Sequence, residues 1–423
     1  MENTLLFILL FLLLFLNVPV AVSLGLSVFT IIFFFADLDI AYFSQQIFNG
    51  INHFTLAAIP LFVLTGNVLS KGGAADRIIR FAKAVVGHFP GGLPMSAIFA
   101  CTIFAAVSGS SPATVAAIGS IMFGAIQEAG YSPKFSVGSI VSAGSLGILI
   151  PPSIVLIVYG VTAEQSIGDL FLAGFIPGAI LGTMLMLVTY IMARREGFKR
   201  VKRASFSEVA TSFKNAFPGL FTIVIIIGGI YGGIFTPTEA AAVSAVYAFF
   251  VSVFVYRDIE LKDIINVTSE SVITSTMILF IIANAMLFAN FITIMQIPQS
   301  LAQWIVDMNF SKVVFLIFIN ILLLIGGNFM EPSGLIMIIV PLILPAAMKL
   351  GIDPIQLGII VTVNMEIGML TPPVGLNLFV ASSISGMNIF EVFKHSLPYF
   401  IVLIIFLLMV TYIPQISLII LGR

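Results

Sequence analysis

The sequence is poor in charge and nearly free of cysteine. Charged residues make up 9% of its 423 positions, whereas soluble domains typically have about 25%. The single cysteine, Cys101, permits no internal disulfide. The three histidines, His53, His88 and His395, lie far apart and close to the ends of apolar segments. The sequence therefore predicts no metal site of the histidine or cysteine type and no intramembrane enzyme with a histidine base.

Apolar residues take the place of the missing charge. Hydrophobic residues make up 60% of the chain, and 40 phenylalanines stand against 18 lysines and arginines. One soluble core cannot bury so many apolar side chains, so the composition predicts an all-α polytopic membrane protein. The net charge of −1 indicates no polyanionic partner such as a nucleic acid.

The apolar segments fall into two classes. A spanning helix needs about 20 apolar residues, and segments such as 168–193 and 396–421 meet that length without interruption. Others are short or broken by glycine, proline and polar residues. The run at 4–36 would form a helix of about 48 Å, so the sequence around Pro19 either kinks one helix or separates two.

Basic residues indicate the orientation. Residues 194–203 hold six of the 18 basic residues, and Lys71, Arg77, Arg80 and Lys83 form a second cluster. Both clusters are predicted to be cytoplasmic. Residues 74–89 have the pattern of an amphipathic helix, either on the cytoplasmic membrane surface or as a solvated loop helix.

The chain contains an internal repeat at a constant spacing of 221. Seven identities occur between positions 130–177 and positions 351–398, and six of the seven are glycine or proline. These two residue types set the path of the backbone. The pairs are Gly130 with Gly351, Pro133 with Pro354, Gly147 with Gly368, Leu149 with Leu370, Pro151 with Pro372, Pro152 with Pro373, and Pro177 with Pro398.

The charges predict that the repeat is inverted. Adding 221 to the basic cluster 71–83 gives 292–304, which has no charge. Equivalent loops with opposite basic bias lie on opposite sides of a membrane, and inverted repeats with broken helices are typical of secondary transporters. The expected divisions are a scaffold at 1–53, a first repeat at 54–214, connecting scaffold helices at 215–271 and a second repeat at 272–423. Within them we expect re-entrant hairpins at about 95–127 and 311–348, and broken helices at about 137–162 and 355–386.

Four interrupted stretches carry the candidate chemistry. They are 108–114, 144–153, 326–334 and 368–377. Hydroxyls and freed carbonyls suit a small cation, and the N-terminus of a returning helix suits an anion. The alternatives are a polar turn between two full spans, and proline-kinked helices without a site.

Ionisable residues at membrane depth are scarce. Glu331 and Glu366 are the clearest carboxylates inside apolar segments, and no lysine or arginine lies in the middle of one. An intramembrane carboxylate indicates function, although Glu366 could instead pair with a scaffold group. An anionic cargo would have to be bound by helix N-termini, hydroxyls and a co-bound cation.

The motifs resemble those of the large membrane subunit of tripartite ATP-independent periplasmic (TRAP) transporters. The matching stretches are AIPLFVLTGNVLSKGG (58–73), SGSSPATVAAIG (108–119), GSLGILIPPS (144–153), GGIFTPTEAAAV (232–243), GNFMEPSG (327–334) and NMEIGMLTPPVGLN (364–377). The resemblance implies an elevator-type, sodium-driven symporter of the bacterial inner membrane. It also implies two partners, a small four-helix membrane subunit and a periplasmic substrate-binding protein that delivers the solute.

The resemblance also implies site residues, with sodium as the coupling ion and no cofactor or catalytic residue. The first sodium site maps to Ser108, Gly147, Ile150 and Pro152, and the second to Gly327, Gly368, Thr371 and Val374. The expected solute contacts are Ser110, Ser111, Thr114 and Glu331. The motifs look most like those of dicarboxylate members, with sialic acid second. The alternative is a sodium-coupled anion transporter or exporter of the same superfamily that works without a binding protein.

Overall fold

The computed structural model describes residues 2–16, 18–35, 39–308 and 310–423, and these residues form helices and no strand. The prediction of an all-α membrane protein is confirmed. Seven of the described helices are long and apolar enough to cross a membrane. They cover Phe54–Lys71, Ile167–Arg195, Phe206–Tyr231, Pro237–Val255, Lys262–Ile294, Pro332–Lys349 and Ile389–Tyr412.

The first apolar run forms two helices. α1 (Glu2–Phe15) and α2 (Val20–Phe34) are separate and pack against each other, with Pro19 at the N-cap of α2. The structure thus selects separation over a kink, because proline suits the start of a helix and not its interior. α3 (Ile40–Ile51), the 3₁₀ turn η1 (Phe54–Ala57) and α4 (Ala58–Lys71) follow.

The amphipathic segment forms α5 (Ala74–Val86) and packs against α6 (Gly92–Ser108) and α11 (Phe206–Ile223). Its apolar residues Ala75, Ile78 and Ala82 are buried in the protein. Its apolar face is therefore covered by neighbouring helices, which neither the membrane-surface nor the solvated interpretation anticipated.

The first repeat unit is a helical hairpin followed by an interrupted helix and a long helix. Its elements are α6 (Gly92–Ser108), α7 (Ser111–Glu128), the π turn η2 (Lys134–Gly138), α8 (Ser139–Gly144), the 3₁₀ turn η3 (Ser145–Ile148), α9 (Ile154–Thr162) and α10 (Ile167–Arg195). The hairpin arms have 17 and 18 residues, about 26–27 Å. This helix length is close to the thickness of a bilayer core. It does not distinguish a re-entrant hairpin from two spanning helices, and the re-entrant path stays a prediction.

The second unit repeats this order at the same spacing. Its elements are α16 (Lys312–Gly327), α17 (Pro332–Lys349), α18 (Pro354–Gly368), α19 (Leu376–Ser385) and α20 (Ile389–Tyr412). α7 and α17 begin and end at equivalent positions of the repeat, since 332 − 111 and 349 − 128 are both 221. The spacing of 221 found in the glycine and proline pattern thus also relates the bounds of α7 and α17, which precede the matched positions.

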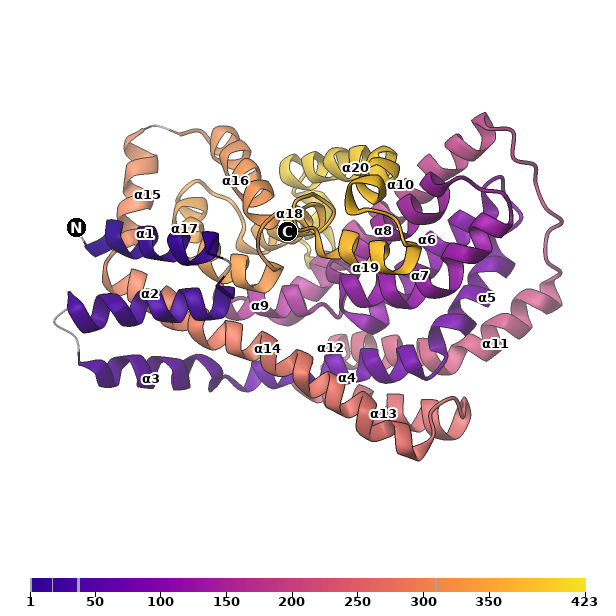
Figure 1. Ribbon diagram of the computed structural model, residues 1–423, viewed down its shortest axis with the longest axis horizontal. Coiled ribbons are helices and arrows are strands. Elements are labelled where there is room, and N and C mark those ends of the chain that lie inside the picture. The colour runs from indigo at the N-terminus through magenta and orange to yellow at the C-terminus, as the bar shows by residue number, and fades with distance from the viewer. Residues whose placement is uncertain (1, 17, 36–38, 309) are drawn as a thin grey trace.

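The remaining helices surround these units. They are the π turn η4 (Val224–Gly228), α12 (Gly229–Tyr231), α13 (Pro237–Phe250), the π turn η5 (Val251–Val255), α14 (Leu261–Ile294), α15 (Ile297–Asp307), α21 (Gln415–Leu418) and the 3₁₀ turn η6 (Ile419–Leu421). α14 has 34 residues, about 51 Å, and crosses Figure 1 diagonally along α2, α3 and α4. α15 was not predicted from the sequence.

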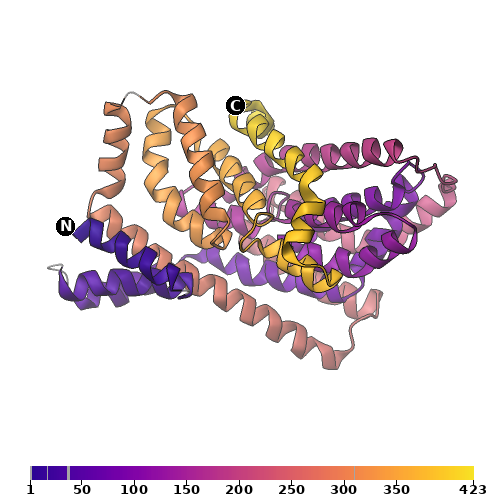
Figure 2. The ribbon, with the colours of Figure 1, turned by 45° about the horizontal axis from the view of Figure 1, so that its top comes forward.

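The two units exchange contacts at the centre of the molecule. α9 of the first unit packs on α17 of the second, and α19 of the second packs on α7 of the first. In Figures 1 and 2 the yellow helices of the second unit lie between its orange hairpin and the magenta helices of the first unit. Every residue of α18 from Ile355 to Gly368 is buried. Such a helix is enclosed by protein on all sides.

The outer helices present apolar side chains outward. Phe11 of α1, Phe33 of α2, Phe217 of α11, Phe250 of α13 and Met277 of α14 are all exposed. Exposed apolar surface of this extent suits contact with lipid or with another membrane protein. The first halves of the broken helices, α8 and α18, are buried in the protein, whereas α19 keeps an exposed side at Phe379.

Candidate functional site

The first hairpin tip is a short turn of small polar residues. Gly109 has a φ of +62° and ends α6, and Ser110 is the N-cap of α7. The hydroxyl oxygens of Ser108 and Thr114 lie 2.7 Å apart, and the Thr114 hydroxyl donates to the Ser110 carbonyl at 2.9 Å. The positive φ favours glycine, and the tip places hydroxyls next to a helix N-terminus.

This tip packs against the break between η3 and α9. A Cβ on Gly147 would lie 2.5 Å from the Ser110 carbonyl oxygen, and one on Gly109 would lie 2.8 Å from the Pro152 carbonyl oxygen. The Ile154 N–H donates to the Gly109 carbonyl at 3.4 Å. The structure therefore brings together the tip and the break on which the first sodium site was predicted.

The second tip packs against the second break in the same way. A Cβ on Gly368 would lie 2.7 Å from the Gly327 backbone, and the Val374 N–H donates to the Asn328 carbonyl at 3.3 Å. Glycine at both positions allows the two backbones to approach. Gly327, Gly368 and Val374, predicted for the second sodium site, thus meet at one contact.

Thr371 and Ile150 offer different oxygens. The Thr371 hydroxyl donates to the Ile367 carbonyl at 2.7 Å, which leaves its lone pairs for a cation. Ile150 has an aliphatic side chain, which lies against Gly178 of α10. Its backbone carbonyl is therefore the only oxygen that this residue can provide to a cation. The peptide bonds Pro151–Pro152 and Pro372–Pro373 are cis in both breaks.

One side-chain contact joins the two units at this centre. The Asn377 amide at the start of α19 donates to the Ser111 hydroxyl of α7 at 2.6 Å, and both residues are fully buried. Asn377 lies in the motif at 364–377, but no role was predicted for it from the sequence. Its position two residues after Gly375, in a turn at membrane depth, was the available signal.

Glu331 has a local partner. It is the N-cap of α17, where its carboxylate accepts from the N–H groups of Ser333 and Gly334 at 3.0 and 3.2 Å and from the Ser333 hydroxyl at 2.9 Å. A carboxylate is favourable at a helix N-terminus. The order Glu-Pro-Ser is the sequence signal of this cap, and a solute contact at Glu331 stays a prediction.

Buried oxygens without hydrogen-bond partners gather on the second broken helix. Among the described residues these include Asn364 Oδ1, both carboxylate oxygens of Glu366 and Asn377 Oδ1. Buried polar atoms are rarely left without a partner. The amide nitrogen of Asn364 does have one, donating to Asn320 of α16 at 2.8 Å, so only the oxygen of that side chain lacks a partner.

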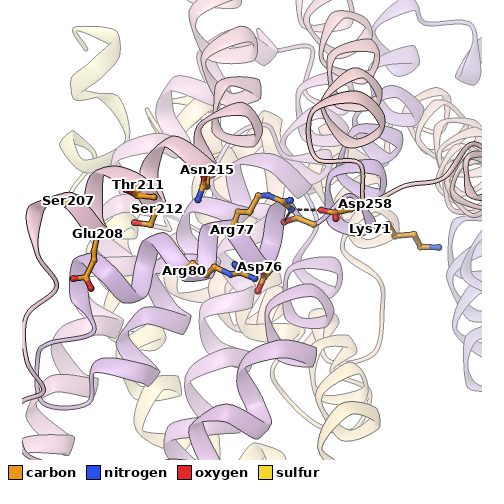
Figure 3. Close-up of a pocket in the computed structure, with 11 residues that line it drawn as sticks. Lys71, Asp76, Arg77, Arg80, Ser207, Glu208, Thr211, Ser212, Asn215 and Asp258 are labelled. Carbon is orange, nitrogen blue, oxygen red and sulfur yellow. Dashed lines mark hydrogen bonds and ion pairs between the residues drawn. The ribbon is translucent and has the colours of Figure 1, made fainter.

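A large polar cavity lies elsewhere. About 830 Å³ in volume, it opens between α5, α11 and the segment after α13 (Figure 3). None of the predicted sodium or solute residues lines it. Its basic residues have carboxylate partners: Arg77 with Asp258 at 2.5 Å, Arg80 with Asp76 at 2.5 Å and Lys71 with Glu270 at 2.6 Å. Lys71 thus links the end of α4 to α14, Arg77 links α5 to the segment before α14, and the Arg80–Asp76 pair lies within α5.

Two interrupted helices, each covered by a hairpin tip, together with seven helices long and apolar enough to cross a membrane, indicate a membrane transporter. Comparison with known proteins is consistent with this class. The family model described as "Tripartite ATP-independent periplasmic transporter, DctM component" matches residues 7–416. The chain belongs to this family of TRAP transporter large permeases, and the resemblance predicted from its motifs is confirmed.

Named relatives cover nearly the whole chain. It is 52% identical over 396 residues to a C4-dicarboxylate TRAP transporter large permease of Pseudomonas aeruginosa, covering 94% of this chain and 93% of that protein. It is 37% identical to a sialic acid TRAP transporter large permease of Vibrio cholerae, covering 95% and 94%. The relatives are permeases and not enzymes, and the chain is a multi-pass membrane protein, of the inner membrane in bacteria.

A solved structure has the same fold at low identity. The YdaH transporter of Alcanivorax borkumensis superposes with a TM-score of 0.62 at 14% identity, covering 90% of this chain and 89% of that one. This likeness concerns the fold alone.

The close glycine contact at the second break predicts the effect of one methyl group. Gly368→Ala should lower the free energy of unfolding by about 1–3 kcal/mol, because a backbone must move to admit the Cβ. Gly124→Ala is the control, since a Cβ there meets nothing within 4 Å and helical alanine is favourable by about 0.5–1 kcal/mol. Thermal unfolding in detergent measures both, and equal effects would contradict the contact.

Proposed function

We propose that this chain is the sodium-coupled transport subunit of a three-part importer for a carboxylate-bearing solute. The observation that carries the proposal is the pair of hairpin tips closed onto two helix breaks. Broken backbone at membrane depth is tolerated where it lines a site inside the protein. Paired breaks near the midplane are where secondary transporters bind solute and coupling ions.

The oxygens at the two breaks support sodium as the coupling ion. Backbone carbonyls and hydroxyls are hard ligands, which suit a small hard cation. The first set comprises Ser108, Gly147, Ile150 and Pro152, and the second comprises Gly327, Gly368, Thr371 and Val374. Each set combines a tip and a break that lie in contact.

The first tip supports an anionic cargo. α7 has 18 residues and begins at this tip, so its N-terminal N–H groups and dipole favour a carboxylate. The hydroxyls of Ser110, Ser111 and Thr114 and the amide of Asn377 lie around the same turn. With no basic side chain in the middle of an apolar segment, the remaining negative charge is offset by the co-bound sodium.

The relatives favour a C4-dicarboxylate as the cargo. Identity is 52% to the named C4-dicarboxylate permease and 37% to the named sialic acid permease. The family is tripartite, so the proposal includes a small membrane subunit on the apolar outer helices and a periplasmic protein that delivers the solute. The direction is import by an elevator movement of the two units.

Uptake into proteoliposomes tests the coupling. The full complex, with small subunit and loaded binding protein, should accumulate a radiolabelled C4-dicarboxylate only with an inward sodium gradient. Equimolar potassium or choline should support no accumulation. Equal accumulation without sodium would refute the coupling, and accumulation without the binding protein would favour an importer or exporter of the binding-protein-independent kind.

The Thr371 hydroxyl is the side-chain ligand that can be removed most simply. Thr371→Ala should raise the half-saturating sodium concentration roughly 5- to 30-fold, as expected for losing about 1–2 kcal/mol of ligand energy. Thr183→Ala is a matched control, because that hydroxyl also donates to a carbonyl four residues back, at 2.8 Å, but is exposed on α10. The same sodium response in both variants would reject the assignment.

A further inference from the structure

Glu366 is a carboxylic acid side chain that is buried and has no hydrogen-bond partner among the described residues. Its side chain is fully buried in α18, and neither carboxylate oxygen has a hydrogen-bond partner. None of the ion pairs among the described residues includes it. The scaffold partner considered from the sequence is therefore not found in the described part of the chain.

A bare carboxylate in this position is unfavourable for two reasons. Removing an ionised carboxylate from water costs several kcal/mol unless a partner compensates it. In addition, Glu366 lies two residues before the end of α18, where the helix dipole places partial negative charge. Both effects favour a positive ligand at this carboxylate.

At the end of α18 the backbone carbonyl of Glu366 also lacks the usual helical hydrogen bond. The Leu370 N–H donates to the Ile367 carbonyl at 3.0 Å, and the Thr371 N–H donates to the Gly368 carbonyl at 3.0 Å. Leu370 therefore does not donate to the carbonyl of Glu366 four residues back. One residue thus brings carboxylate and carbonyl oxygens, the ligands that hard cations prefer.

The side chain leaves α18 on a different face from the second predicted sodium site. At about 100° per residue, Glu366 is turned about 200° from Gly368, whose face contacts Gly327. It lies about 80° from Gly358, which packs against Tyr159 of α9 and Leu170 of α10. It lies about 80° on the other side from Gln356, which donates to carbonyls of α20. Around the helix axis, the Glu366 side chain is therefore on the side of α18 that packs against the first unit and α20.

The charge of Glu366 is present in the second unit and not at the equivalent position of the first. The equivalent position in the first unit is Ser145, since 366 − 145 is again 221. Ser145 is also buried, and its hydroxyl donates to the Ser142 carbonyl at 2.6 Å. The first unit thus satisfies this position locally with a neutral group. The second unit places an unpartnered negative charge there.

We propose that Glu366 is a ligand of a further sodium ion, bound on the face of α18 opposite the Gly327–Gly368 contact. This inference rests on the sodium coupling proposed above and adds a position to it. The Glu366 carboxylate supplies the negative charge and the ligand oxygens, and the bound ion removes the cost of the buried anion.

Equilibrium binding of ²²Na⁺ to the purified complex tests the position, with Glu366→Gln as the neutral variant of equal shape. The variant should bind one sodium ion fewer than the wild type, and the Hill coefficient of sodium for uptake should fall by about one. Without sodium, Glu366→Gln should be at least as thermally stable as the wild type, and sodium should raise its unfolding temperature less. Glu128→Gln, at the exposed end of α7, is the matched control and should behave as the wild type.

Unchanged sodium stoichiometry and unchanged stabilisation in Glu366→Gln would overturn this site, as expected for a carboxyl that keeps its proton, and would leave the proposed function standing. A wild-type complex that binds no sodium would refute the proposed function itself. If Glu366→Gln does not fold, Glu366→Asp serves instead. Moving the charge by one methylene should keep the number of ions and weaken binding at least roughly tenfold, and unchanged affinity would overturn the site.

Discussion

The structure depends on how backbone polar groups are satisfied where lipid excludes water. An unpaired N–H or C=O in that setting costs several kcal/mol, so a helix can be broken only where other protein covers the break. Here each break is covered by a hairpin tip at glycine contacts, Gly147 against Ser110 and Gly368 against Gly327. Gly147, Gly327 and Gly368 at these contacts are among the residues proposed to bind sodium, so the structural requirement and the proposed chemistry involve the same residues.

The two units share a backbone plan and differ in charge. At the tip, Ser110 caps α7, while its counterpart in the repeat, Glu331, caps α17. At the break, Ser145 of the first unit corresponds to Glu366 of the second. At both positions the first unit has a serine and the second a glutamate. This asymmetry agrees with an anionic solute near the first tip and additional cation binding on the second unit.

Much of this architecture could be predicted from the sequence, because glycine and proline restrict the backbone locally. The spacing of 221 between these residues at 130–177 and 351–398 also relates α7 to α17, just before the matched positions. What could not be predicted depends on contacts distant in sequence. The Asn377–Ser111 hydrogen bond joins residues 266 apart, and the Arg77–Asp258 pair joins residues 181 apart. Neither contact produces a recognisable pattern in the neighbouring sequence. The packing of α6 and α11 on α5 produces none either.

The central claim is that the two units are inverted across the membrane, and the side from which two equivalent residues are labelled tests it most directly. Glu128 and Lys349 end α7 and α17, occupy equivalent positions of the repeat and are both exposed. In a background with the buried Cys101 replaced, Glu128→Cys and Lys349→Cys would be treated with a membrane-impermeant maleimide, in intact cells and in inside-out vesicles. Inversion predicts labelling of Glu128→Cys only from the cytoplasmic side and of Lys349→Cys only from outside. Labelling of both from the same side would contradict it.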